Sequence, residues 1–313
     1  MSLDLIVNDV ASVTDRIVML TLRAAQGGAL PAYNAGAHLD FDLGGLGIRS
    51  YSLTDFSVPT SEPESYRIVV QKEDNGQGGS RFMHRLQKGD SLTASTPKND
   101  FRLMNGPALL LAGGIGVTPL ISFGTALAHR GLDYEFHYTS RSADQTVFAD
   151  ALCRLHGDRL QLWHDDSAVC DLAAIINATP RTQHIYVCGP KGMIEAVKSI
   201  ASSAGFSDNR VHFELFVTPV PEDGDTAFEV EIRSSGAVIT VPADKSIIDA
   251  LEDAGIDLVY DCQRGDCGIC QTDVLEGEPD HRDVVLSDSE KAEGNVMQIC
   301  VSRSKSARLV LDL

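Results

Sequence analysis

Apolar and polar residues alternate along the first hundred positions, with the period of two that is typical of half-buried β-strands. Gly, Pro and Asp are frequent between these runs. We therefore predict strands at residues 17–22, 38–43, 48–53, 66–71 and 91–94, and one short helical stretch between Gly79 and Leu86. So many short strands close most readily into a barrel, so this region is predicted to be an antiparallel β-barrel.

Beyond residue 104 the pattern changes, because short apolar runs alternate with segments of helical period. This alternation predicts a parallel sheet with helices on both faces. Ligands of such sheets bind beyond the carboxyl ends of the strands. The expected strands are 109–112, 134–139, 160–163, 185–188 and 211–216, and the expected helices are 119–129, 148–155, 171–176 and 192–204.

Composition divides the chain of 313 residues into three domains, which suits usual domain sizes. The barrel is assigned to residues 1–103, the α/β domain to residues 104–217 and a third domain to residues 226–313. Residues 218–225, Thr-Pro-Val-Pro-Glu-Asp-Gly-Asp, are rich in proline and acid, which is typical of a solvated linker.

Four cysteines in the third domain have the spacing of an iron–sulfur site. Cys262, Cys267 and Cys270 form the C-x4-C-x2-C run of plant-type ferredoxins, and Cys300 follows from a distant segment. Four thiolates can hold a [2Fe-2S] cluster with two on each iron. The spacing therefore predicts that these four residues bind a metal cluster and that the chain carries single electrons.

Zinc and disulfides are the alternative uses of these thiols. Structural zinc sites usually present paired C-x2-C or Cys/His knuckles rather than a run of three thiols. Residues 1–6 lack the basic start and long apolar core of a secretory signal, so we expect a reducing compartment, where disulfides are rare. Cys153 and Cys170 are expected to be small buried or half-buried residues rather than reactive thiols.

The formal net charge of -18 argues against binding to nucleic acid or to an anionic membrane surface. No apolar run approaches the roughly 20 residues that span a bilayer. We therefore expect a soluble, cytoplasmic protein. The acidic third domain could steer a basic partner protein, although ordinary solubilising charge explains it equally well.

Two segments of the barrel region carry candidate binding groups. Arg49-Ser50-Tyr51-Ser52 combines a cation for phosphate, an aromatic face and two hydroxyls, although alone it also fits a strand with one buried tyrosine. Gly78-Gly79-Ser80 precedes the helical stretch, where free amides and a hydroxyl could receive a phosphate. Together they indicate a site for a phosphorylated aromatic ligand.

Two further segments lie at strand-to-helix junctions of the α/β region. Gly113-Gly-Ile-Gly-Val-Thr-Pro119 differs from the G-x-G-x-x-G fingerprint, but its glycines would likewise let backbone approach a pyrophosphate; a simple tight turn is the alternative. Cys188-Gly-Pro190, followed by Met193, ends a strand on the same side of the sheet. Cys188 would then lie beside a ligand rather than in the core.

These four motifs, in this order, resemble the ferredoxin–NADP reductase superfamily, and the domain order is similar to its phthalate dioxygenase reductase and vanillate O-demethylase reductase branch. The resemblance covers essentially the whole chain. It implies a flavin-binding antiparallel β-barrel, a nucleotide-binding parallel α/β domain and an α+β, β-grasp-like ferredoxin domain. The cofactors that it implies are FMN, NADH and a [2Fe-2S] cluster.

The resemblance also implies roles for individual residues. Arg49 and Ser80 would contact the FMN phosphate, Tyr51 would lie against the ring and Ser52 near its reactive nitrogen, with Ser50, Lys72 and Gly79 in the same cleft. Glu214 and Phe216 look like the segment beside the flavin, or are simply the end of the last strand. The residues implied at the pyridine nucleotide are Gly113, Gly114, Gly116, Thr118 and Pro119, with Cys188, Gly189, Pro190 and Met193 near the nicotinamide. No side chain is expected to act as a general acid or base.

Arg141 lies where the adenosine ribose would fall. Its guanidinium could accept a 2′-phosphate and favour NADPH, or it is a surface arginine without a ligand. Similar Arg-Ser sequences occur in NADH users of this branch, so we expect NADH.

A nicotinamide donates two electrons at once and a cluster takes one, so a flavin must mediate between them. The resemblance implies the reductase component of a two-component Rieske non-haem iron oxygenase, with a separate terminal oxygenase as partner. The chain itself lacks Rieske Cys-x-His pairs and a 2-His-1-carboxylate set. A reductase that feeds a cytochrome P450 and a non-catalytic electron carrier are the alternatives. We expect a monomer.

Overall fold

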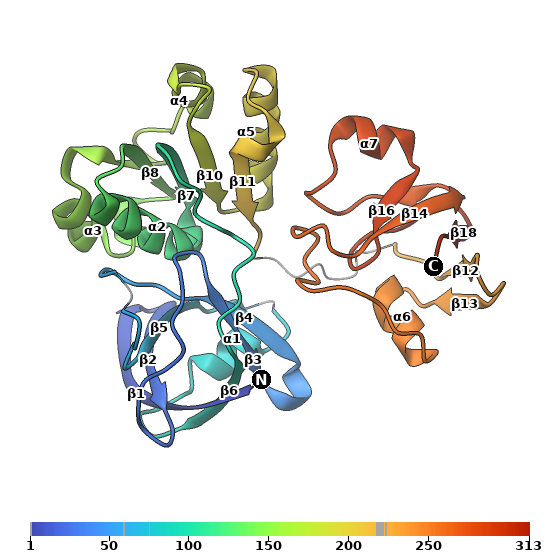
Figure 1. Ribbon diagram of the computed structural model, residues 1–313, viewed down its shortest axis with the longest axis horizontal. Coiled ribbons are helices and arrows are strands. Elements are labelled where there is room, and N and C mark those ends of the chain that lie inside the picture. Colours follow the sequence, from blue (N-terminus) through green and yellow to red (C-terminus); the bar gives the residue numbers. More distant parts are fainter. Residues whose placement is uncertain (1, 59, 75, 217–221, 223) are drawn as a thin grey trace. The chain divides into compact units, whose positions relative to one another are not determined.

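The computed structural model describes residues 2–58, 60–74, 76–216, 222 and 224–313. The chain divides into two compact units, and the division falls between Glu214 and Leu215 (Figure 1). The boundary predicted near residue 104 falls inside the first unit, and most of the predicted linker at residues 218–225 lies outside the described residues. These boundaries stay predictions.

The first unit begins with a six-stranded antiparallel sheet of order β4-β3-β6-β1-β2-β5. An antiparallel bridge between Leu53 and Ile68 connects the two ends of this sheet, β4 and β5, and closes it into the predicted barrel. The short helix α1 (Gly79–Met83) follows β5. The strands are β1 (Ser2–Thr14), β2 (Ile17–Ala24), β3 (His38–Asp42), β4 (Ile48–Ser52), β5 (Tyr66–Gln71) and β6 (Ser91–Ser95).

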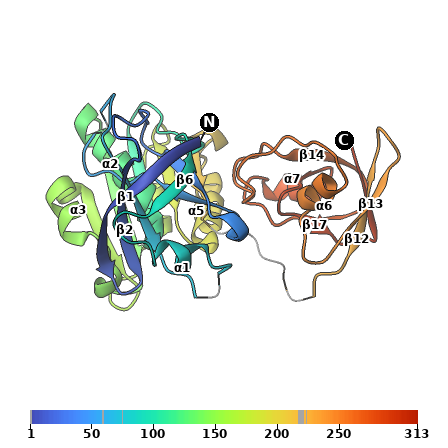
Figure 2. The ribbon, with the colours of Figure 1, turned by 90° about the horizontal axis from the view of Figure 1, so that it is seen from below.

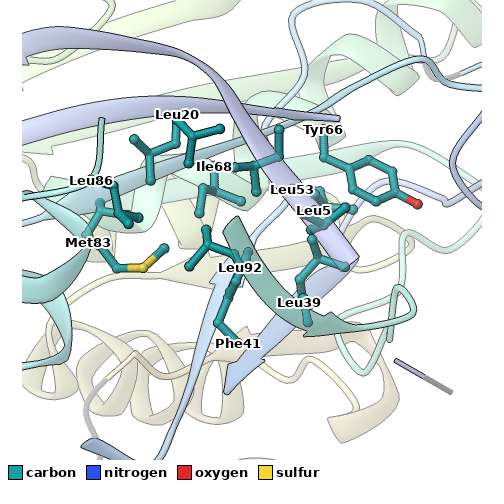
Figure 3. Close-up of a cluster of buried hydrophobic side chains, with 14 of the residues drawn as sticks. Leu5, Leu20, Leu39, Phe41, Leu53, Tyr66, Ile68, Met83, Leu86 and Leu92 are labelled. Carbon is teal, nitrogen blue, oxygen red and sulfur yellow. The ribbon is translucent and has the colours of Figure 1, made fainter. Parts of the chain in front are cut away.

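Strand β1 has no counterpart among the predicted strands. Its pairing with β2 shifts register between Val7 and Asp9, so the alternation of apolar and polar residues is broken there. The interior of the barrel is nevertheless a continuous apolar core (Figure 3). Leu5 of β1, Leu20 of β2 and Phe41 of β3 are fully buried in it. This core fixes β4, the strand that carries the Arg49-to-Ser52 motif.

The same unit continues into a five-stranded parallel sheet of order β11-β10-β7-β8-β9. From β7 the chain first adds strands on one side and then returns to add β10 and β11 on the other. Right-handed crossovers in opposite directions place the helices on both faces, as predicted. The elements are β7 (Ala108–Gly113), α2 (Val117–Arg130), β8 (Tyr134–Ser140), α3 (Ala149–His156), β9 (Leu160–His164), α4 (Leu172–Ala178), β10 (His184–Cys188), α5 (Lys191–Ser203) and β11 (Val211–Glu214).

The second unit is a mixed sheet of order β13-β12-β18-β14-β16, with a small two-stranded sheet of β15 and β17 (Figure 2). Helix α6 (Ile247–Asp253) starts with a capping box formed by Ser246 and Asp249 and buries Ile247, Ile248 and Leu251. Helix α7 (Asp288–Glu293) is solvent-exposed on most sides. The strands are β12 (Phe228–Ile232), β13 (Val238–Val241), β14 (Gln271–Glu276), β15 (Pro279–Asp280), β16 (Val296–Gln298), β17 (Arg303–Ser304) and β18 (Arg308–Leu311).

The fold of the second unit is of the α+β class that was expected for residues 226–313. Across both units, the structure holds no helix within its described residues with the length and apolar character that a membrane crossing requires.

Candidate functional site

Arg49 of β4 lies directly over the start of α1. A Cβ at Gly79 would lie 2.7 Å from Arg49 Cγ and 2.8 Å from Nε, so only glycine leaves room for this side chain. The guanidinium is held by Gln77, whose Oε1 accepts from Nη2 at 2.8 Å, and by the Ile48 carbonyl at 2.7 Å. The structure therefore brings together the two barrel segments that were predicted to bind a phosphorylated ligand. The Arg49 guanidinium of the first segment lies beside Gly79, which precedes Ser80 in the second.

The neighbouring polar groups around Arg49 differ in how they are used. The Ser80 hydroxyl accepts a hydrogen bond from the Glu73 amide at 3.0 Å, which leaves its own proton available to a further acceptor. Lys72 is half-buried at the end of β5, and its backbone is tied to Arg16 on both sides. The backbone of Lys72 is therefore fixed to Arg16, which lies between β1 and β2.

Side chains of β4 alternate between two faces, so Tyr51 shares a face with Arg49 and Ser52 shares one with Ser50. The Tyr51 ring packs 5.9 Å from the Phe41 ring, and burial raises the pKa of its phenol to about 12. Ser50 is already committed, because its hydroxyl donates to Asp40 at 2.5 Å. Burial opposes ionisation of Asp40, but hydrogen bonds from Ser50 and Lys98 outweigh it and lower the pKa of this carboxyl.

Ser52 carries an observation that points to a ligand. Ser52 is 6% exposed, and its hydroxyl has no hydrogen-bond partner among the residues that the structure describes. A buried hydroxyl without a partner costs free energy, on the order of 1–3 kcal/mol. The group that the resemblance implies here, a flavin with nitrogen and oxygen acceptors at its ring edge, fits because it would supply that partner.

The barrel motif is joined to the nucleotide motif through helix α2. This helix forms hydrogen bonds with the chain that leaves β4. The Ser122 hydroxyl donates to the Leu53 carbonyl at 2.9 Å and accepts from the Asp55 amide at 3.0 Å. The Thr125 hydroxyl also donates to the Asp55 carbonyl at 3.1 Å. Strand β4 and the segment that opens α2 are therefore held in one fixed arrangement.

The two predicted nucleotide segments follow β7 and β10, which lie side by side where the strand order reverses. This reversal is the position at which open α/β sheets bind ligands. A Cβ at Gly116 would lie 2.2 Å from the Cys188 carbonyl oxygen, and one at Gly189 would lie 3.0 Å from Gly113 Cα. The two segments thus pack backbone against backbone, and the absence of side chains leaves a cradle.

Other members of these segments shape the cradle in different ways. A Cβ at Gly113 would meet both Pro190 and Met193 at 2.8 Å, so these two side chains cover the glycine. Gly114, at φ +54°, has open space beside it. Thr118 and Pro119 are buried, and the Thr118 hydroxyl donates to the Ile115 carbonyl at 3.1 Å, so both support the turn from beneath.

Cys188 differs from its expected position beside a ligand, because its side chain is fully buried in the structure. Only its carbonyl faces the cradle, where it packs on Gly116. Arg141 is exposed beyond β8, and the Asp166 amide donates to its carbonyl at 3.3 Å. The last strand of the sheet ends at Glu214, so the predicted strand 211–216 is two residues too long and the half-buried Phe216 lies outside β11.

The second unit brings the four predicted cysteines together from two segments, the loop of residues 262–270 and the turn at Cys300, and none of them forms a disulfide. The thiol of Cys262 contacts those of Cys267 and Cys300, and Cys270 contacts Cys300. Within the described residues, no three Cys, His, Asp or Glu side chains converge on the position of one metal ion. A chain of pairwise contacts suits a two-iron cluster, in which each iron takes two thiolates.

Backbone conformation and contacts between thiols shape this loop. Gly265 and Gly268 both have φ near +78°, and Gln263 has φ +52°, which is unusual for a residue with a side chain. Hydrogen bonds from Cys267 and Cys300 lower the pKa of Cys262 and raise the pKa of the two donors, and the backbone amide of Arg264 donates to the Cys262 Sγ at 3.3 Å. Thiolates are the metal-binding form of cysteine, so the residues present fit a [2Fe-2S] cluster.

Two residues of the cluster region were not found from the sequence. Gln298 is fully buried, and its Oε1 lies 3.5 Å from the Cys270 sulfur. Neither its spacing nor its chemistry distinguishes it in the sequence. Gln263 is likewise unremarkable until its backbone conformation is known. For the remaining cysteines, the expectation is wrong for Cys153, which is exposed because α3 turns Leu152 and His156 to the core, and right for the half-buried Cys170.

Comparison with known proteins decides the family. Residues 230–305, which contain all four cysteines, match the 2Fe-2S iron-sulfur cluster binding domain family. The whole chain is similar to the vanillate O-demethylase oxidoreductase of Pseudomonas sp. strain HR199, with 40% identity over 99% of this chain and 100% of that protein. The carnitine monooxygenase reductase subunit of Acinetobacter baumannii is 37% identical over 98% of this chain and 97% of its own length. The chain belongs to this family of oxygenase reductases.

Solved structures agree with this assignment. Phthalate dioxygenase reductase, described as a modular structure for electron transfer from pyridine nucleotides to [2Fe-2S], has a TM-score of 0.75 and 34% identity over 100% of this chain and 98% of its own. The full-length cytochrome P450 CYP116B46 of Tepidiphilus thermophilus has a TM-score of 0.77 and 35% identity; the match covers 100% of this chain and 42% of that one.

These findings confirm the predicted family and fold class. They also confirm an oxidoreductase with a 2Fe-2S domain, in a family whose members compared above are oxidoreductases or reductase components of oxygenases.

Proposed function

We propose that this oxygenase reductase passes electrons from NADH through FMN and the [2Fe-2S] cluster to the terminal oxygenase of a two-component Rieske system. The observation that supports this proposal is that one chain holds three features. These are a buried Ser52 hydroxyl without a partner among the described residues, a glycine cradle at the sheet reversal, and four cysteines whose thiols contact one another in pairs. Each of these features fits one of the three cofactors that the relay needs.

In the barrel, we assign Arg49 and Ser80 to the FMN phosphate. Arg49 presents a guanidinium fixed by Gln77 and the Ile48 carbonyl, so little side-chain entropy is lost when a phosphate binds. Tyr51 offers its ring face to the flavin, and Ser52 donates its hydroxyl at the ring edge. Gly79 keeps the path of Arg49 open, whereas Ser50, bound to Asp40, supports β4.

At the sheet reversal, Gly113, Gly116 and Gly189 allow the close packing that shapes the cradle, and Gly114, with open space beside it, lets the NADH pyrophosphate approach backbone amides. Pro190 and Met193 cover Gly113 and limit the access of water to the nicotinamide side. When bound, the nicotinamide supplies a hydride to the flavin, and no side chain needs to move a proton. The hydrogen bonds of Ser122 and Thr125 to the segment after β4 keep the barrel and the cradle in a constant orientation.

A cytochrome P450 is the second candidate acceptor, since this chain is similar over its whole length to part of CYP116B46. We propose the Rieske oxygenase because relatives that match over their entire length are reductase subunits of separate oxygenase systems. Reconstitution with each purified acceptor, followed by NADH-dependent product formation, separates the two.

An anaerobic titration with NADH tests the proposed relay. We expect absorbance bleaching of both the flavin and the cluster, with FMN released on denaturation. A preparation that holds only the cluster and does not respond to NADH would instead support the non-catalytic carrier. Titration with NADPH in parallel tests whether Arg141 accepts a 2′-phosphate, and we expect NADH to be preferred.

We further propose that the protein acts as a monomer in the cytoplasm, without binding membranes or nucleic acid. The formal charge of -18 supports the last two points, because anionic surfaces would repel it. Sedimentation at micromolar concentration, with and without anionic vesicles, tests all but the compartment.

A further inference from the structure

The cluster-binding loop contains a buried carboxylate that the electron relay does not use. Asp266 stands directly before Cys267, and its side chain is 5% exposed. Its Oδ2 accepts a hydrogen bond from the Leu215 amide at 2.8 Å and lies 3.5 Å from Arg264 Nε. A buried carboxylate is costly unless it is bound in this way. Leu215 is thus tied to the cluster loop, although 51 positions separate it from Asp266.

Leu215 occupies a special position in the chain. It is the first residue of the second unit, and it directly follows Glu214, the last residue of β11. Its side chain is 2% exposed, so it is packed as well as hydrogen-bonded. The first residue of the second unit is therefore fixed to the cluster loop of that same unit.

The far end of the predicted linker is also fixed on the second unit. Asp225 accepts hydrogen bonds from both guanidinium nitrogens of Arg282, at 2.9 and 2.6 Å, and from the Glu222 amide at 2.9 Å. Only 8% of the Asp225 side chain is exposed. Leu215 and Asp225 therefore both belong to the second unit.

We propose that Asp266 is a positioning residue for electron transfer: its hydrogen bond to Leu215 ties the cluster-binding loop to the joint between the units, which is the Glu214–Leu215 peptide. This inference rests on the proposed transfer from flavin to cluster. Without the bond, the loop gains freedom relative to the point where the chain enters the second unit. Misplacement of reacting groups by about 1 Å can slow a reaction by up to about a hundredfold.

A pair of variants separates the hydrogen bond from the charge. Asp266→Ala removes the acceptor, whereas Asp266→Asn removes the charge but keeps an acceptor oxygen for Leu215. The exposed Asp257→Ala is the control for loss of an acidic side chain on the same unit. Anaerobic stopped-flow with NADH follows flavin and cluster reduction separately, and a redox titration gives the midpoint potential of the cluster.

We expect Asp266→Ala to slow cluster reduction by about tenfold or more, with flavin reduction by NADH unchanged. Asp266→Asn should restore the rate, and Asp257→Ala should match the unaltered protein. A normal rate in a cluster-loaded Asp266→Ala variant would overturn the proposal. The proposal would also be overturned if both Asp266 variants slowed cluster reduction equally and shifted the midpoint potential of the cluster by the same amount. Absence of flavin reduction by NADH in the unaltered protein would instead refute the proposed function.

Insertions test the same proposal if Asp266→Ala fails to retain the cluster. Two glycines between Glu214 and Leu215 lengthen the proposed joint, and two between Val220 and Pro221 lengthen the proline-rich segment. We expect the first insertion to slow cluster reduction and the second to leave it unchanged. The opposite pattern would make the proline-rich segment the joint and would reject the role of Asp266.

Discussion

The glycine cradle at the sheet reversal and the cluster-binding loop are both ligand sites, but they are formed in opposite ways. In the cradle, Gly116 and Gly189 lie against backbone, and the shape exists because side chains are missing. At the cluster-binding loop, three thiols of the loop meet a fourth from the distant Cys300, and a non-glycine residue, Gln263, takes up a left-handed conformation. The first site is complete before its ligand arrives. The second is stabilised by the metal that its thiolates bind.

The largest effect is expected from Cys267→Ser, which removes a cluster ligand. Delivery of electrons to a one-electron acceptor should be abolished, while reduction of the flavin by NADH continues at nearly the normal rate. Stopped-flow spectroscopy and reduction of cytochrome c measure the two steps. If both steps were lost in a folded variant that keeps FMN, the cluster would not lie downstream of the flavin.

Gly116→Ala should break the cradle without touching the cluster. Its Cβ would lie 2.2 Å from the Cys188 carbonyl, and backbone cannot move aside cheaply. We expect the KM for NADH to rise by about tenfold or more and the unfolding free energy to fall by about 1–3 kcal/mol. Gly192→Ala, where a Cβ meets nothing within 4 Å, is the matched control. Equal behaviour of the two variants would show that the cradle is loose.

Arg49→Gln addresses the barrel half of the first unit. Loss of a charge-assisted contact to phosphate should weaken FMN binding by about 1.5–3 kcal/mol, which flavin fluorescence measures directly. Addition of excess FMN should restore activity. Unchanged affinity would remove Arg49 from the phosphate site.

The smallest effect is expected at the opposite, amino ends of the sheet strands. Arg210 donates to His184 at 3.0 Å, so His184 in turn donates to His212 at 2.9 Å and both rings are neutral. Burial, His184 and Arg210 lower the pKa of His212 to about 4. Because the folded pKa lies below the unfolded one, the stabilisation is complete above about pH 6.5 and is lost as the pH falls toward 4.

Between pH 7 and pH 5, the free energy of unfolding should therefore fall by about 2 kcal/mol more in the unaltered protein than in His212→Gln, as measured by thermal unfolding. NADH-dependent flavin reduction should hardly change, since these residues lie away from the cradle. Identical pH dependence in both proteins would mean that His212 is not the responsible group.

The sequence predicted the strands and helices of the first unit closely, because their apolar periods are regular. It missed β1, where the bulge at Val7–Asp9 interrupts alternation, and it extended the last strand past Glu214. The binding motifs were found because glycine and cysteine spacing is local. Asp266 and Gln298 were not, because their importance depends on burial and on partners distant in sequence.

The hydrogen bonds that join α2 to Leu53 and Asp55 have a consequence for the history of this architecture. They make the barrel and the nucleotide sheet one structural unit in evolution. A mutation in α2 or in the segment after β4 that broke these bonds would change how the barrel and the sheet are aligned. The peptide after Glu214 is where a different electron acceptor could be grafted without disturbing hydride transfer. Gene fusion and domain exchange should therefore cut the chain at this peptide, and leave the pairing of barrel and sheet intact.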